Sequence, residues 1–123
     1  MDIFDGIKEA LAEILDIEDR EITPDTYIIR ELGAESIDLL ELAVSLNAKF
    51  EIDVNDDEIF LKTLRLHMDE GLKQGKEAAG YLKEKFPSLK KDRLKEIIAD
   101  LEAGPALKVK DLISYVRLKL ETR

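Results

Sequence analysis

Cysteine and tryptophan are absent from the 123 residues, and histidine occurs once, as His67. Without cysteine the chain has no disulfides, no thiolate metal ligands and no cysteine nucleophile. One histidine is too little for an ordinary zinc site, so we expect no metal centre and assign His67 no catalytic role. No stretch approaches the ~20 apolar residues that cross a bilayer, and the chain begins with acids where a secretory signal has basic residues. We therefore expect a cytoplasmic protein without stable membrane insertion.

Basic residues are scarce in the first half of the chain. Residues 1–60 hold 18 acids and 4 bases, residues 61–123 hold 10 acids and 15 bases, and the formal net charge is −9. Such an excess of acid disfavours binding to nucleic acid phosphates. An acidic first half can attract and orient basic protein partners. The same charge also suits an acidic protein that is merely soluble, so charge alone names no partner.

All the regular structure that the apolar spacing predicts is helical, in one domain over residues 1–123. Apolar residues recur every three or four positions over 3–16, 36–50 and 109–121, which predicts three amphipathic helices. Ser36 is suited to the N-cap of the second helix. Residues 17–35 contain turn-forming residues and several apolar side chains, which predicts a long ordered loop anchored on the core.

Residues 61–105 predict a helical hairpin inserted before the last helix. Its first helix runs from Leu61 to Phe86, where Pro87 stops it, and three glycines weaken that helix enough for a bend or a break. Its second helix follows Ser88 and ends at Gly104.

The segment ELGAESIDLLEL, residues 31–42, resembles the acyl carrier protein motif D-L-G-A-D-S-L-D-x-x-E-L. The residues that agree in identity and spacing are Leu32, Gly33, Ala34, Ser36, Asp38, Glu41 and Leu42. Near the other end, LKVKDLISYV resembles the end of the same family through Val109, Asp111, Leu112 and Tyr115. Residues 61–105 have no counterpart. The resemblance implies an up-and-down helical bundle that carries the insertion.

The resemblance also implies that Ser36 is the attachment site of 4'-phosphopantetheine, a cofactor donated by coenzyme A. The thiol of this arm carries acyl chains as thioesters. A serine at a helix N-terminus lies where the helix dipole and free N–H groups favour a phosphate. No histidine or lysine close by in the sequence activates Ser36 as a nucleophile, so we expect modification by another enzyme and no enzymatic activity. Serine as a plain N-cap is the common alternative.

The second predicted helix has two apolar sets. One set faces a core, while Ile37, Leu40 and Val44 lie among acids on a neighbouring face, where periodicity alone favours a wider core. The resemblance instead assigns this face to docking of a phosphopantetheinyl transferase and of acyl-handling enzymes such as ketosynthases or acyltransferases. The residues of this mixed face are Glu35, Ile37, Asp38, Leu40, Glu41 and Val44. Glu35 stands where the family usually has Asp, so the negative charge is kept but lies on a longer side chain.

The family shelters acyl chains inside the bundle. The candidate walls of such a pocket are Leu42, Leu46, Ile52, Val54 and Ile59, which we also expect to form the core. The insertion could enlarge this space, offer a docking surface, or simply pack on the bundle.

We therefore expect a monomeric acyl carrier for fatty acid biosynthesis or another lipid pathway. A specialised pathway, such as envelope lipid or long-chain synthesis, stays open. The alternatives are a carrier for polyketide synthesis and an unmodified carrier fold that serves as a protein-interaction module.

Overall fold

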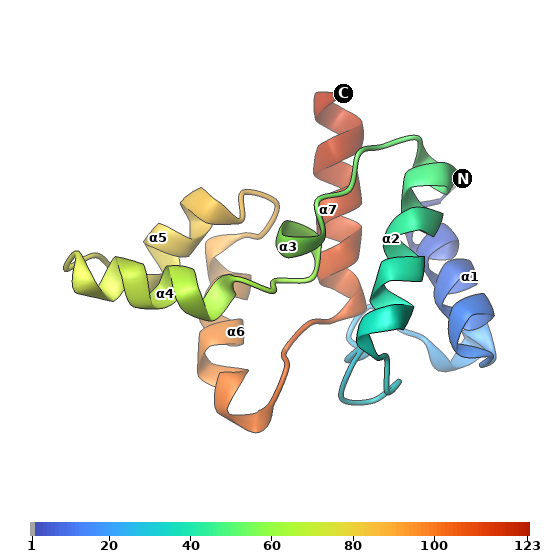
Figure 1. Ribbon diagram of the computed structural model, residues 1–123, viewed down its shortest axis with the longest axis horizontal. Helices are drawn as coiled ribbons and strands as arrows, with labels where there is room; N and C mark the ends of the chain where they lie inside the picture. Colours follow the sequence, from blue (N-terminus) through green and yellow to red (C-terminus); the bar gives the residue numbers. More distant parts are fainter. Residues whose placement is uncertain (1) are drawn as a thin grey trace.

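The computed structural model describes residues 2–123, and within this range the regular structure is helical, with one isolated antiparallel bridge between Tyr27 and Lys108. The all-α prediction is confirmed. Figure 1 shows two groups of helices, a carrier body and an insertion. The body contains α1 (Ile3–Leu15), the short 3₁₀ turn η1 (Asp19–Glu21), α2 (Ser36–Phe50), α3 (Asp56–Ile59) and α7 (Val109–Thr122). The insertion contains α4 (Leu64–Lys73), α5 (Ala78–Lys85), α6 (Lys91–Asp100) and η2 (Leu101–Ala103).

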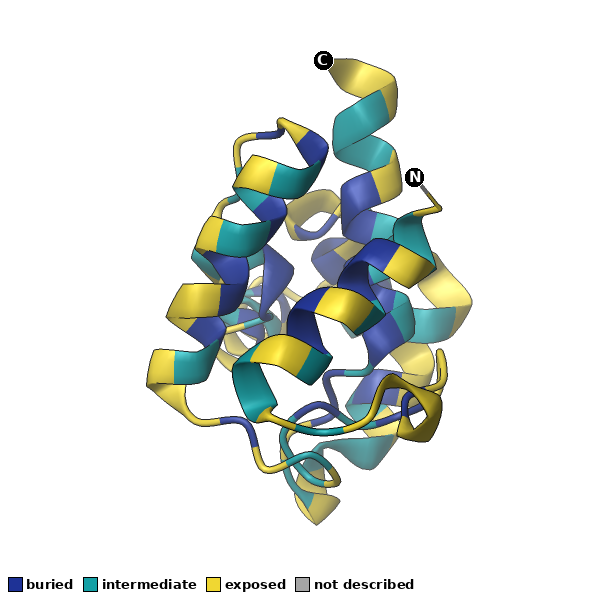
Figure 2. Ribbon diagram, turned by 90° about the vertical axis from the view of Figure 1, so that its right-hand side faces the viewer, coloured by how far each residue is buried: buried dark blue, intermediate teal, exposed yellow. Residues whose placement is uncertain are grey.

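The carrier body is held together by the apolar stripes that the sequence predicts. Asp2 accepts a hydrogen bond from the Asp5 N–H at 3.1 Å and starts α1, which ends at Asp16 in a left-handed conformation. α1 packs on both α2 and α7, and their buried positions face one another while the exposed positions lie outside (Figure 2). The almost fully buried side chains of this core include those of Ile7, Leu11, Leu42, Leu46 and Leu112.

The insertion contains three α-helices, because the first arm of the predicted hairpin breaks into α4 and α5, in line with the bend or break expected from its glycines. The break falls at Gly75, which has φ +73° after the end of α4. The Lys76 N–H donates to the Gly71 carbonyl at 2.9 Å and the Gly75 N–H donates to Leu72 at 3.0 Å, which is a Schellman ending. Glycine takes this conformation at little cost, so the chain turns back there and α5 packs on α4.

A second core lies inside the insertion and packs α4, α5 and α6 together. Its fully buried side chains include Leu82, Phe86, Leu94 and Ile97. Leu61 packs against both this cluster and the core of the carrier body. The insertion therefore has a core of its own and meets the body along a shared boundary, while Leu66 and Leu72 of α4 stay exposed.

Two glycines of the insertion give opposite expectations on substitution by alanine. A Cβ on Gly71 would lie 2.8 Å from the Tyr81 ring and 3.0 Å from the Tyr81 Cβ, whereas one on Gly80 would meet only Glu77 Oε1, at 3.5 Å. Overpacking costs typically ~1–3 kcal/mol, and alanine is the better helix former by ~1 kcal/mol. Gly71→Ala should therefore lower the free energy of unfolding by about 1–2 kcal/mol, and Gly80→Ala should raise it by about 0.5–1 kcal/mol. Urea unfolding of both variants checks this, and equal effects would contradict it.

A buried ion pair joins the insertion to the last helix of the body. Arg93 of α6 donates from Nε to Asp111 Oδ1 at 2.7 Å and from Nη2 to Asp111 Oδ2 at 2.8 Å. Arg93 Nη2 also donates to the Ala106 carbonyl at 2.9 Å, and Asp111 accepts from the Lys108 N–H at 2.9 Å. Asp111 is the only charged residue that is fully buried among residues 2–123. This network fixes α6 on the start of α7.

A second polar contact joins the insertion to the loop before α2. Arg30 donates from Nη1 to Asp100 Oδ1 at 3.1 Å and from Nη2 to the Gly104 carbonyl at 2.8 Å, while the Tyr27 hydroxyl donates to Asp100 Oδ2 at 2.6 Å. The hydrogen bond from Tyr27, and then that from Arg30, lower the pKa of Asp100 below its usual value. Because the pKa of Asp100 is lower in the folded chain than in the unfolded chain, its ionised carboxylate stabilises the fold at pH values above the unfolded-state pKa. This contribution to the free energy of unfolding is lost as the pH falls through the pKa of Asp100 in the folded chain.

Candidate functional site

Ser36 is exposed at the first residue of α2, and it is not the N-cap that the sequence predicted. Glu35 takes the N-cap position, and its N–H donates to Asp38 Oδ2 at 2.8 Å. The capping role moves by one residue because Asp38, three positions after Glu35, is well placed to accept that N–H. Within residues 2–123 the Ser36 hydroxyl has no hydrogen-bond partner, so this oxygen is open to modification rather than used in the fold.

The loop before α2 holds Ser36 in place and leaves space in front of it. The Ala34 N–H donates to the Ile28 carbonyl at 3.3 Å, the Gly33 N–H donates to Ile29 at 3.1 Å, and the Ile28 N–H donates to Leu107 at 3.1 Å. Gly33 has φ +70°, and a Cβ there would meet nothing within 4 Å. A phosphodiester on Ser36 fits this site, because Ser36 is exposed and the first turn of α2 offers the positive end of its dipole.

The mixed face of α2 is an exposed surface, and the wider core that periodicity alone favours is wrong. Ile37 is 61 % exposed, Leu40 is 51 % exposed and Val44 is 67 % exposed. Glu35 and Glu41 are exposed beside them. Exposed large apolar side chains grouped on one face and bordered by acids are typical of a surface that binds another protein. Asp38 is half-buried and caps the helix, so its carboxylate is less free than that of Glu41.

The five predicted walls of an acyl pocket lie inside the carrier body. Leu42, Leu46, Ile52 and Ile59 are buried in its core, and Val54 packs against them. They pack together as core, which was their expected first role. That these side chains also move apart to bind an acyl chain stays a prediction.

Sequence reasoning missed a pocket of about 340 Å³ between the body and the insertion. Its walls come from the loop before α2, the segment around Leu61, the end of α6 and the segment 104–107. Helical periodicity could not reveal it, because its residues come from four separate parts of the chain.

Within residues 2–123 no group of three or more histidine, cysteine or acidic side chains is arranged to hold a metal ion. The helices in the same range are all too short or too polar to cross a membrane.

A small acidic helical body with an exposed serine at the start of its second helix defines a carrier domain that bears a prosthetic arm. The family model described as phosphopantetheine attachment site matches residues 5–65. The chain belongs to the acyl carrier protein family, and its prosthetic group is a covalently attached 4'-phosphopantetheine. Acyl carrier proteins are carriers rather than catalysts, and they interact with acyl-handling enzymes.

Curated relatives match a little less than half of the chain. The acyl carrier protein of a Sulfurovum species is 38% identical over 58 residues, which are 47% of this chain and 77% of the relative. The acyl carrier protein of Wolinella succinogenes is 40% identical over 58 residues, or 47% of this chain and 76% of the relative. That of Helicobacter pylori is 34% identical over the same length, or 47% of this chain and 74% of the relative. No solved structure matches this chain.

Proposed function

We propose that this protein carries acyl chains as thioesters on a 4'-phosphopantetheine arm at Ser36 and delivers them to enzymes of lipid synthesis. The observation that carries the proposal is the position of Ser36, which is exposed at the N-terminus of α2, in the family's motif, with its hydroxyl outside any hydrogen bond among residues 2–123. A serine used only as a cap would be tied to the backbone of the first turn. Here Glu35 and Asp38 make the capping contact.

The chain's own residues supply attachment and orientation. When bound, the arm supplies a thiol that holds acyl groups as thioesters. The Ser36 oxygen would attack the phosphorus of coenzyme A that bears the pantetheine arm, the pyrophosphate bond would break, and 3',5'-ADP would leave. The serine proton would go to a base of the transferase, since the exposed hydroxyl has no base of its own within hydrogen-bond distance in the described range. The N–H groups of the first turn of α2 and the positive end of its dipole face the new negative charge.

Incubation with coenzyme A and a broad-specificity phosphopantetheinyl transferase tests this proposal. Intact-mass measurement should show one added phosphopantetheine group per chain. A folded protein that gains no mass with any competent transferase would leave only the alternative of an unmodified protein-interaction module.

We also propose that the mixed face of α2 is the docking surface for the transferase and for acyl-handling enzymes. Its acids attract basic partners over a distance, and the exposed side chains of Ile37, Leu40 and Val44 provide the apolar area that holds a complex together. Rim charges chiefly raise the association rate and are screened by salt.

Charge reversal at Glu41 tests this docking surface. Glu41→Lys should slow the loading of Ser36 by about tenfold at low salt, and the deficit should shrink at high salt because the attraction is screened. Glu41 is a cleaner probe than Asp38, because Asp38 also caps α2. Glu102→Lys, an exposed position in η2 of the insertion, makes the same change in net charge and serves as the control. Equal loading rates for the two variants would contradict the docking assignment.

We further propose that residues 1–123 act as one domain, in which the insertion is rigidly attached to the carrier body. The two polar contacts at Arg93 and Arg30 support this, since each joins a residue of the insertion to a residue of the body.

A further inference from the structure

The pocket between the body and the insertion is partly open to solvent, measures about 340 Å³ and is lined mostly by apolar side chains. Pockets that hold small organic ligands start at about 300 Å³. Side chains that are otherwise buried, Leu64, Ile97 and Leu107, form part of its wall.

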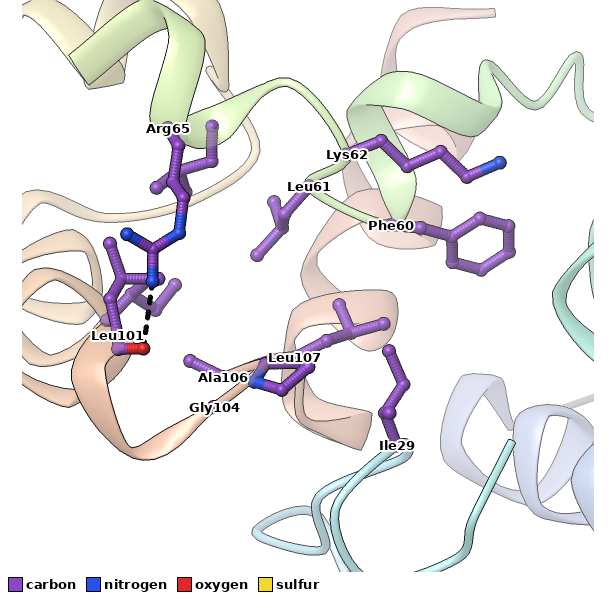
Figure 3. A pocket seen from close by; sticks show the side chains of 12 residues that line it. Ile29, Phe60, Leu61, Lys62, Arg65, Leu101, Gly104, Ala106 and Leu107 are labelled. Carbon is purple, nitrogen blue, oxygen red and sulfur yellow. Dashed lines mark hydrogen bonds between the residues drawn. The ribbon is translucent and has the colours of Figure 1, made fainter. Parts of the chain in front are cut away.

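The walls of the pocket are held in place by contacts that do not depend on an occupant. Arg65 donates to the Leu101 carbonyl at 3.0 Å and closes one side, and Arg30 donates to the Gly104 carbonyl at 2.8 Å on another. Figure 3 shows Leu61 reaching into the space from one side and Ala106 and Leu107 from the opposite side. Leu61 has a left-handed backbone because it ends α3 in a Schellman motif, in which the Leu61 N–H donates to the Glu58 carbonyl at 3.4 Å and the Lys62 N–H donates to the Asp57 carbonyl at 3.1 Å.

The chemistry of the lining selects an apolar, flexible occupant. Apart from Lys62 and Arg65, the lining side chains are apolar or glycine, and no acid is among them. A cationic ligand therefore has no partner, and a polar ligand has few groups to satisfy its hydrogen bonds. An aliphatic chain gains from this lining by burial alone.

The pocket also lies against the loop that carries the attachment site. Ile29 lines the pocket, and its carbonyl accepts from the Gly33 N–H, in the segment that leads directly to Ser36. Leu107, on the opposite wall, accepts from the Ile28 N–H. A chain tethered at Ser36 is thus delivered next to the pocket and needs no separate capture from solution.

We propose that this pocket binds the distal part of a long acyl chain carried on the Ser36 arm, so that the insertion makes the protein selective for long chains. This inference rests on the proposed carrier function. It places the chain between body and insertion, lined by Ile29, Leu61, Ile97, Leu101, Ala106 and Leu107, rather than among the core residues Leu42 and Leu46.

The test loads the full chain at Ser36 from butyryl-coenzyme A or dodecanoyl-coenzyme A and follows methyl signals by NMR. The dodecanoyl form should shift the methyl signals of Ile97 and Leu101, and the butyryl form should leave them as in the protein with a free thiol. Shifts confined to Leu42 and Leu46, or no shifts in the dodecanoyl form, would overturn the pocket assignment while the added mass still supports the carrier. Absence of any added mass would instead refute the carrier function.

A pocket-filling variant and a free fatty acid provide independent checks. Dodecanoyl loading should raise the Tm of the parent protein by several degrees. It should not raise the Tm of Leu101→Trp, because the indole would occupy the pocket. The control is Leu72→Trp at a site on α4 that is 57 % exposed, and its Tm should rise as in the parent protein. A Tm rise retained in Leu101→Trp would count against the proposal. Free dodecanoate added to Ser36→Ala at equal concentration should leave Ile97 unshifted; an equal shift there would identify an untethered fatty acid as the occupant.

Discussion

Ser36→Ala should reduce loading with phosphopantetheine from one group per chain to none, with little change in the free energy of unfolding. The substitution removes the only oxygen that the proposed phosphodiester uses. Since Ser36 is exposed and its hydroxyl makes no hydrogen bond among residues 2–123, its loss should change stability by no more than about 0.5 kcal/mol. Intact mass after incubation with coenzyme A and transferase measures the first effect, and urea unfolding measures the second.

Ser45→Ala is the matched control, because Ser45 lies on the same helix and is half-buried. This variant should gain the same mass as the parent protein. Added mass on Ser36→Ala would place the arm elsewhere. A loss of more than about 1 kcal/mol on Ser36→Ala would mean that the hydroxyl has a structural role after all.

The helices of the carrier body could be predicted from sequence because their signals are local. The predicted bounds 3–16, 36–50 and 109–121 differ from those of α1, α2 and α7 by at most one residue. Apolar spacing and the flanking turn residues are sufficient for such helices. The family motif placed Ser36 correctly at the start of α2, yet the sequence predicted Ser36 as the N-cap, a position that Glu35 takes. The position of the N-cap depends on tertiary details of side-chain reach. The Asp38 carboxylate accepts from the Glu35 N–H, and this contact makes Glu35 the N-cap.

The insertion was harder to predict because its structure depends on contacts between distant residues. Glycine at three positions weakened the expected long helix, and only the structure shows that Gly75 turns the chain while Gly71 lets Tyr81 pack closely. The partners Arg93 and Asp111 are 18 residues apart, and no periodicity links them. The pocket at the boundary has the same origin, since its walls come together only when α6 is fixed on α7.

The Arg93–Asp111 pair should therefore be the contact whose loss costs the most stability. Asp111→Ala leaves the Arg93 guanidinium, whose side chain is only 10% exposed, without its two-oxygen partner, and it frees the Lys108 N–H at the start of α7. Removing one partner of a buried ion pair typically costs about 3–5 kcal/mol. Arg93 keeps the exposed Glu96 carboxylate at 3.3 Å, so we expect a loss near the lower end of this range, about 3 kcal/mol. Urea unfolding should show this loss as a lower midpoint.

An exposed ion pair and a double substitution separate the effect of burial from that of charge. Glu9 bonds to Lys49 at 2.9 Å with its side chain 61% exposed, so Glu9→Ala should cost less than about 1 kcal/mol. The double variant Arg93→Met with Asp111→Leu should recover a large part of the loss, because apolar side chains of similar size leave no buried charge without a partner. If Asp111→Ala costs no more than Glu9→Ala, the Arg93–Asp111 pair adds no more to stability than an exposed ion pair. A large loss that the double variant relieves means instead that the cost comes from a buried charge left without its partner, so that either a paired charge or an apolar pair at this site lets the insertion stay on the carrier body.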